Sequence, residues 1–80
     1  MDILDTLQEV FREVFDQPEL RLVESTGPKD IAGWDSVAQI KLVLLIQERF
    51  GVEFDSSELT EFRTAKDICD TVSRHLGGVG

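Results

Sequence analysis

The sequence predicts an all-α fold, a small bundle of three to four helices with a long loop between the first two. Apolar residues recur at helical spacing in three separate stretches, and capping patterns or glycines mark where these stretches begin and end. The chain has only 80 residues, which is enough for one small domain. We therefore expect a single domain over residues 1–76 and a flexible tail over residues 77–80.

The first helix is expected over about residues 2–16. Its apolar side chains recur at steps of three and four, which places them on one face of a helix. Pro18 follows directly and cannot continue the helix. The members of the apolar face are Ile3, Leu4, Leu7, Val10, Phe11, Val14 and Phe15.

Residues 16–34 show no helical period and are expected to form an ordered loop. Gly27 and Pro28 are typical of turns. A strand over residues 20–24 would have no partner strand elsewhere in the chain. A connection of this length needs side chains that hold it against the domain, and the candidates are Leu20, Leu22, Val23 and Ile31.

The central helix is expected over residues 36–50, with Gly51 ending it. One broad apolar stripe is predicted, and three further residues, Leu42, Leu45 and Ile46, widen it. A helix that is apolar around most of its circumference should be covered on several sides, so Leu44 is expected in the core. The stripe itself consists of Val37, Ile40, Val43, Leu44 and Phe50.

Two capping patterns follow. Residues 55–58, Asp-Ser-Ser-Glu, predict a short helical turn with Leu59 and Phe62 facing inward. Residues 64–67, Thr-Ala-Lys-Asp, predict the start of the last helix, which Gly77 and Gly78 end. The apolar stripe of that helix is Ala65, Ile68, Cys69, Val72 and Leu76.

Charge and composition exclude several classes of function. The 16 acidic residues against 8 basic ones give a formal net charge of −8, which argues against binding to nucleic acid or to an anionic membrane surface. No apolar run is longer than residues 42–46, which is too short to cross a bilayer, so no membrane insertion is expected. Cys69 is the only cysteine, so no intrachain disulfide can form, and a cytoplasmic protein is expected. We also expect a monomer. Cys69 and His75 fall on roughly opposite faces of one helix, so they form no catalytic pair, and they are too few to hold zinc.

Ser36 lies where the loop ends and the central helix begins. One interpretation makes Ser36 the N-cap, in a capping box with Gln39. The other uses the free backbone N–H groups and the positive dipole end of a helix N-terminus, which favour a phosphate. Ser36 would then be the attachment point of a phosphoester, and the spacing alone leaves both interpretations open.

Over essentially its whole length the chain resembles the acyl carrier proteins, most clearly at residues 30–36, Asp-Ile-Ala-Gly-Trp-Asp-Ser, and residues 50–54, Phe-Gly-Val-Glu-Phe. The resemblance implies a non-catalytic carrier with 4′-phosphopantetheine on Ser36, transferred from coenzyme A by a phosphopantetheinyl transferase. It also implies that Asp35 belongs to the motif that the transferase recognises and helps to coordinate its metal. Trp34 either anchors the loop or contacts these enzymes.

The resemblance further implies a loading enzyme and a downstream transferase or synthase that handle the cargo as an acyl or aminoacyl thioester. In this family the central helix is a recognition surface, so Val37, Gln39 and Lys41 are candidate partner contacts. Ala38, Lys41, Gln47 and Arg49 replace acids frequent in fatty acid carriers, which suggests a specialised pathway, such as polyketide synthesis. An acyl chain would be sheltered by Leu42, Leu45, Ile46 and Phe62, unless these residues form a closed core.

Two other functions remain open from the residues alone. In the first, the chain is a small acidic adaptor that binds another protein through a helical face, and Ser36 is a plain N-cap. A nucleic-acid mimic is disfavoured by its modest and uneven charge.

Overall fold

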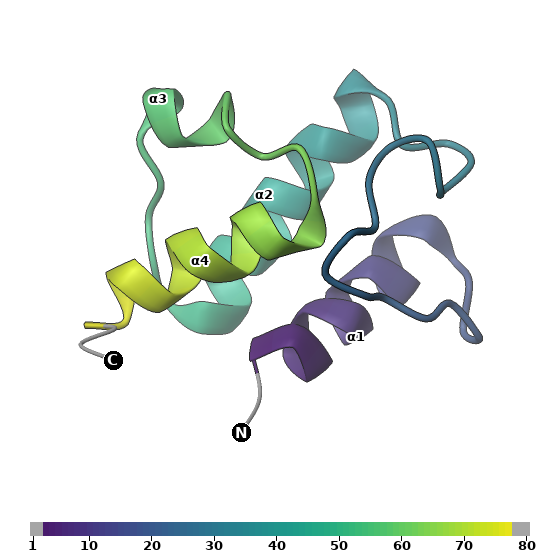
Figure 1. Ribbon diagram of the computed structural model, residues 1–80, viewed down its shortest axis with the longest axis horizontal. Coiled ribbons are helices and arrows are strands. Elements are labelled where there is room, and N and C mark those ends of the chain that lie inside the picture. The colour runs from purple at the N-terminus through teal and green to yellow at the C-terminus, as the bar shows by residue number, and fades with distance from the viewer. Residues whose placement is uncertain (1–2, 78–80) are drawn as a thin grey trace.

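The computed structural model describes residues 3–77, which contain four helices and no strand (Figure 1). These are α1 (Ile3–Phe15), α2 (Ser36–Phe50), the short α3 (Ser56–Leu59) and α4 (Ala65–His75). The predicted all-α bundle with a long first loop is thus confirmed. Residues 78–80 of the expected tail lie outside the described residues. No helix among the described residues has the length and apolar character needed to span a membrane.

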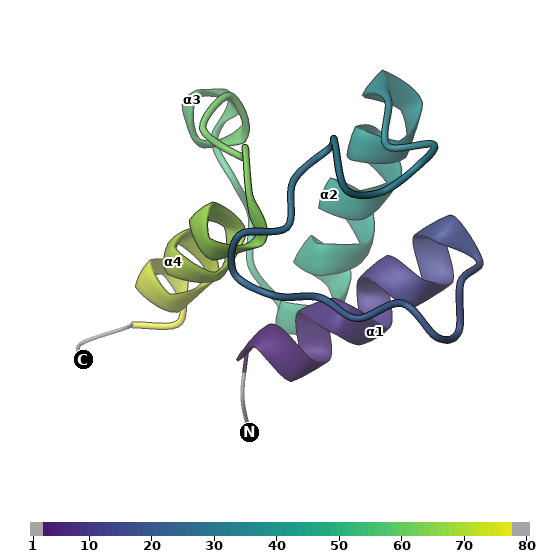
Figure 2. The same cartoon turned by 45° about the vertical axis from the view of Figure 1, so that its right-hand side comes forward.

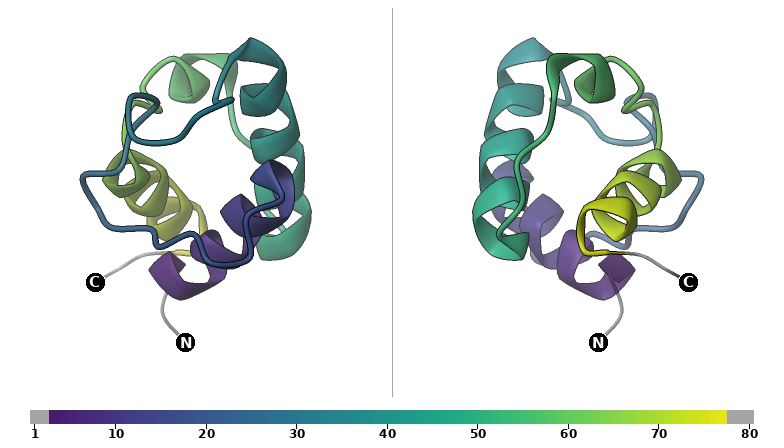
Figure 3. Two further views of the ribbon diagram at one scale, coloured as in Figure 1. Left: turned by 90° about the vertical axis from the view of Figure 1, so that its right-hand side faces the viewer. Right: turned by 90° about the vertical axis from the view of Figure 1, so that its left-hand side faces the viewer.

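The core lies between α1, α2 and α4. Helix α1 packs against both other long helices, and Figure 3 shows the three arranged around a common interior with α3 at one end. Burying these apolar faces supplies the main favourable contribution to folding. The largest fully buried side chains come from all three helices and are Leu7, Val10, Phe11, Leu42, Ile46, Ile68 and Val72.

The long loop is held to α1 by both apolar and polar contacts. Leu20, Leu22 and Ile31 are buried as expected, whereas Val23 is 55% exposed and the expectation for it was wrong. Polar contacts at the neighbouring Leu20 and Leu22, rather than burial of Val23, hold this part of the loop to α1. The Arg12 Nε donates to the Leu20 carbonyl over 2.8 Å, and the Leu22 N–H donates to Gln8 Oε1 over 2.9 Å.

The same loop also caps α4. The Ala65 N–H donates to the Thr26 carbonyl and the Lys66 N–H donates to the Glu24 carbonyl, each over 2.9 Å. The first N–H groups of a helix lack partners within it, so these loop carbonyls supply them. Figure 2 shows the loop passing from α1 to the start of α4 and back towards α2. The loop is therefore an ordered part of the bundle.

Helix α2 corrects the sequence prediction of one broad buried stripe. Ala38, Leu42, Val43 and Ile46 face the core, but Val37, Ile40 and Leu44 are 58–61% exposed. Since α2 lies at the outside of the bundle, only one of its faces is covered. The expectation that Leu44 is a core residue was wrong.

The predicted ends of the helices are largely confirmed. Gly51 ends α2 with φ 67°, a left-handed conformation that glycine adopts without steric cost. The Thr64 side chain accepts from the Asp67 N–H and begins α4 as predicted. Leu76, expected on the buried stripe of α4, is 53% exposed because it follows the last helical residue.

Candidate functional site

The N-terminus of α2 is capped by Asp35, which corrects the prediction that Ser36 is the N-cap. The Asp35 backbone is extended, and its Oδ1 accepts from the Ala38 N–H over 2.9 Å. Asp and Ser both cap helices well, and here the helix begins at Ser36, one residue earlier than a capping box with Ser36 as N-cap requires. Gln39 therefore makes no capping box with Ser36.

Ser36 is the first residue of α2, and its side chain is free. The residue is exposed, and its hydroxyl makes no hydrogen bond with any of residues 3–77. Within the same range, the backbone N–H groups of Ser36 and Val37 have no acceptor either. An exposed hydroxyl thus lies beside two unpaired N–H groups.

The electrostatics at this point favour an anion. Helix α2 has 15 residues and no acidic residue in its first turn, so the positive end of its dipole is offset only by the Asp35 cap. Free N–H groups and a dipole of this sign are the usual features of phosphate sites at helix N-termini. The exposed Ser36 hydroxyl, without a hydrogen-bond partner among the described residues, is compatible with a phosphoester at this position.

Trp34 fixes the end of the loop just before this site. Its ring packs edge-on against Phe11, with centroids 5.2 Å apart, and lies 6.1 Å from Phe15. The indole is only 9% exposed. Its Nε1–H donates to Gln39 Oε1 over 2.7 Å, which ties the loop to the first turn of α2.

The other predicted partner contacts lie on the exposed side of α2. Val37, Ile40 and Leu44 follow one another at helical spacing, with Lys41 exposed among them. Lys41 forms no ion pair with the described residues, whereas Arg49 lies 3.1 Å from Glu13 Oε2 in α1. Lys41 is therefore the unpaired cation of this helix.

The four residues proposed to line an acyl pocket belong to the core or its edge. Leu42, Ile46 and Phe62 are buried, and Leu45 is partly buried against the same cluster. Phe62 packs edge-on against Phe54, with ring centroids 5.1 Å apart. The structure brings these residues together as packed side chains.

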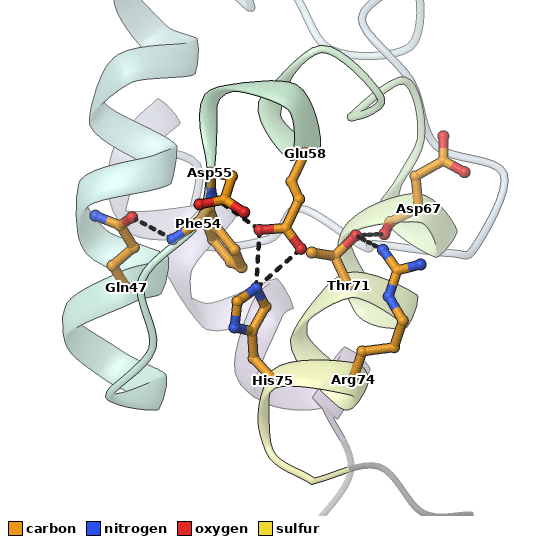
Figure 4. A network of polar contacts seen from close by, with 8 residues as sticks. All are labelled: Gln47, Phe54, Asp55, Glu58, Asp67, Thr71, Arg74 and His75. Carbon is orange, nitrogen blue, oxygen red and sulfur yellow. Dashed lines mark hydrogen bonds and ion pairs between the residues drawn. The ribbon is translucent and has the colours of Figure 1, made fainter.

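A polar contact that the sequence did not predict lies at the α3 end (Figure 4). His75 Nε2 is 2.9 Å from both carboxylate oxygens of Glu58, whose Oε1 also accepts from the Asp55 N–H over 2.8 Å. The Asp55 N–H and His75 lower the pKa of Glu58. The capping pattern of residues 55–58 predicts the contact between the Asp55 N–H and Glu58. No local pattern predicts the contact between His75 and Glu58, which are 17 positions apart.

Metal binding finds no support among residues 3–77, where no three His, Cys, Asp or Glu side chains are grouped to hold an ion. Cys69 is partly buried against the core. The arrangement as a whole defines a small helical domain that presents the Ser36 hydroxyl, free among the described residues, at the N-terminus of a long helix.

Comparison with known proteins identifies the class. Residues 5–72 match a family model described as a phosphopantetheine attachment site, and the chain belongs to that family. The family consists of carriers that hold 4′-phosphopantetheine covalently.

Several acyl carrier proteins are similar to this chain along nearly its whole length. The acyl carrier protein of Thermobifida fusca is 25% identical over 73 residues, covering 91% of this chain and 92% of its own. That of Thermosynechococcus vestitus is 29% identical over 80 residues, covering 95% and 98%. The solution structure of holo acyl carrier protein from Geobacter metallireducens superimposes with a TM-score of 0.89 at 31% identity, over 98% of this chain and 90% of that one.

Proposed function

We propose that Ser36 carries the 4′-phosphopantetheine and that the chain, a single carrier domain over residues 1–76, tethers acyl or aminoacyl groups as thioesters. The observation that carries this proposal is the exposed Ser36 hydroxyl beside two unpaired N–H groups at the start of α2. The serine also lies inside the stretch that matches the attachment-site family.

Attachment requires a phosphopantetheinyl transferase and coenzyme A. The Ser36 hydroxyl oxygen bonds to the phosphorus atom of coenzyme A that carries the pantetheine. The bond from that phosphorus to the leaving adenosine 3′,5′-bisphosphate breaks, and the serine proton passes to the transferase. The chain supplies the acceptor and holds it in place. A thiol on a long tether then meets each partner enzyme at a high effective concentration, which makes catalysis by the carrier itself unnecessary.

Asp35 is proposed to serve the transferase as well as the fold. Its Oδ1 is used by the Ala38 N–H, while its Oδ2 has no partner among the described residues. A free carboxylate oxygen next to the acceptor serine suits a magnesium ion held by the transferase. Trp34 positions this turn and, through the 9% of its surface that stays accessible, is a second candidate contact.

Partner enzymes are proposed to dock on the exposed side of α2, at Val37, Gln39 and Lys41, with Ile40 and Leu44 extending the surface. Exposed apolar side chains in a continuous row are typical of protein interfaces. They also lie on the helix that begins with Ser36, so a partner that receives the thiol comes close to them. The partners are a loading enzyme and a downstream transferase or synthase.

A specialised pathway, polyketide synthesis being one example, is inferred from the charge on α2. Only Glu48 is acidic between residues 36 and 50, against Lys41 and Arg49. Because Arg49 is already paired with Glu13, Lys41 is the one cation of α2 that is left for a partner. Complementarity then favours an apolar docking site with a carboxylate opposite Lys41.

Shelter for an acyl chain is proposed between α2 and the α3 region, where Leu42, Leu45, Ile46 and Phe62 pack together. An acyl chain would enter by displacing Phe62 from Phe54, since the two rings close this side of the core. The carrier would work in the cytoplasm as a monomer.

Intact mass spectrometry tests attachment directly. The purified protein is incubated with coenzyme A and a broad-specificity phosphopantetheinyl transferase, and it should gain the mass of one phosphopantetheine. Ser36→Ala should gain nothing, whereas the matched variant Ser56→Ala should be modified like the wild type. A folded wild-type chain that stays unmodified would leave an unmodified helical adaptor as the function.

A further inference from the structure

A shallow hollow on the surface lies directly beside Ser36. Loop residues and the first two turns of α2 form its walls, and apart from Ser36 itself these are Pro28, Trp34, Asp35, Gln39 and Ile40. Three of these side chains are apolar rings or branched chains. The hollow thus offers an apolar surface within a few bonds of the serine hydroxyl.

Gln39 gives this surface a directed hydrogen-bond donor. The indole N–H of Trp34 can only donate, so the Gln39 atom that meets it at 2.7 Å is the amide oxygen. The amide nitrogen of Gln39 is therefore left for other partners, and it has none among residues 3–77. Since Gln39 lies three residues after Ser36 on the same face of α2, this nitrogen belongs to the Ser36 side of the helix.

The chemistry of the phosphopantetheine arm matches both features. One methylene group beyond its phosphate the arm has a quaternary carbon with two methyl groups, followed by a carbon with a hydroxyl and by an amide carbonyl. Methyl groups gain free energy from apolar contact, and the phosphate, hydroxyl and carbonyl oxygens all accept hydrogen bonds. Asp35 is the one charged side chain that lines the hollow, and its Oδ1 is held by the Ala38 N–H.

We propose that the Trp34–Gln39 pair and the hollow around it bind the first part of the arm. The dimethyl group packs against Trp34 and Ile40, and the Gln39 amide nitrogen donates to an oxygen of the arm. The outer part, with the thiol, stays free to reach partner enzymes. This inference rests on the proposed attachment at Ser36.

Trp34 is the only tryptophan, so it reports on its own surroundings. Isotope-labelled protein is compared before and after conversion by the transferase, with conversion checked by mass. We expect contacts between the arm's methyl protons and the Trp34 ring protons in nuclear Overhauser spectra. The Trp34 indole N–H and Gln39 side-chain amide resonances should also shift, together with the tryptophan fluorescence.

Two glutamine variants test whether the arm binds specifically in the hollow or whether modification has only a general effect on the spectra. Gln39→Glu keeps an oxygen for the Trp34 indole but removes the amide donor, so the methyl contacts and the fluorescence change should be lost in protein whose full conversion has been checked by mass. Gln47→Glu is the matched control, because Gln47 Oε1 likewise accepts an N–H, from Phe54 over 2.9 Å, but at the other end of α2. This control should behave as the wild type does.

The outcomes distinguish binding of the arm in the hollow from attachment at Ser36. If the protein is converted but only the backbone amide resonances of Ser36 and Val37 shift, the arm is solvated and its binding in the hollow is disproved. Methyl contacts that persist unchanged in converted Gln39→Glu would overturn the role of the Gln39 donor. Absence of conversion would instead contradict the proposed function.

Discussion

Two helices of this chain begin with the same dipeptide. Asp35-Ser36 starts α2 and Asp55-Ser56 starts α3, with the aspartate as N-cap and the serine exposed in both cases. The helices differ in length, since α2 has 15 residues and α3 has four. A longer helix aligns more peptide dipoles and has the stronger positive end.

The first turns of the two helices also differ in the acidic side chains that they contain. In α3 the carboxylate of Glu58 lies in the first turn, accepts from the Asp55 N–H and is held by His75. A phosphate on Ser56 would therefore face a carboxylate. The first turn of α2 has no acidic residue. The dipeptide alone does not define an attachment site, because helix length and first-turn charge decide its electrostatics.

The largest effect is expected from Phe11→Ala. Phe11 is fully buried and supports Trp34, on which the α2 start depends, so the change should cost about 3–5 kcal/mol of unfolding free energy. The free energy is measured by urea titration. A cost below about 1 kcal/mol would show that the Ser36 end does not rest on this contact.

A smaller effect is expected from Asp35→Ala, which removes the cap of α2. The loss should be about 0.5–2 kcal/mol, measured by urea titration. Asp35→Asn is the control, because its amide oxygen still accepts from the Ala38 N–H and should preserve stability. If modification slows sharply in Asp35→Asn while stability is preserved, the Asp35 carboxylate serves the transferase. Equal modification rates for the wild type and Asp35→Asn would contradict that role.

Acid should weaken the α3 end selectively. The Asp55 N–H and His75 lower the pKa of Glu58 from its ordinary value of 4.5, so its stabilising contribution is present above that value and is lost as the pH falls through the lowered pKa. The stability difference between wild type and Glu58→Gln, measured by thermal unfolding, should therefore be larger at pH 6 than at pH 3. A difference independent of pH would exclude this contribution.

The smallest effect is expected from Leu44→Ala. Leu44 is 58% exposed on α2, so the free energy of unfolding should change by no more than about 0.5 kcal/mol in a urea titration. A loss similar to that of Phe11→Ala would place Leu44 in the core after all.

The sequence predicted the helices well because their periods and end signals are local. The α1 stripe was predicted correctly because one apolar face of a helix normally faces the core. The same reasoning failed for Val37, Ile40 and Leu44, since periodicity does not tell a buried apolar face from one left exposed. The N-cap of α2 was misplaced by one residue, because Asp35 and Ser36 have similar capping preferences.

The site was only partly predictable for similar reasons. Asp35 and Ser36 are neighbours in sequence, and the resemblance to acyl carrier proteins selected them. The edge-on packing of Trp34 against Phe11 and the Glu58–His75 contact join residues far apart in the chain. Such contacts depend on how the helices pack, which a single sequence does not specify.

The most direct test of the central claim is to locate the modification by fragment mass spectrometry of the converted, folded protein. Ser36 and Ser56 lie in different fragments, and each follows an aspartate at a helix start. We predict one phosphopantetheine per chain, on Ser36, with Ser56 unmodified. A group found on Ser56, or on neither serine, would contradict the account.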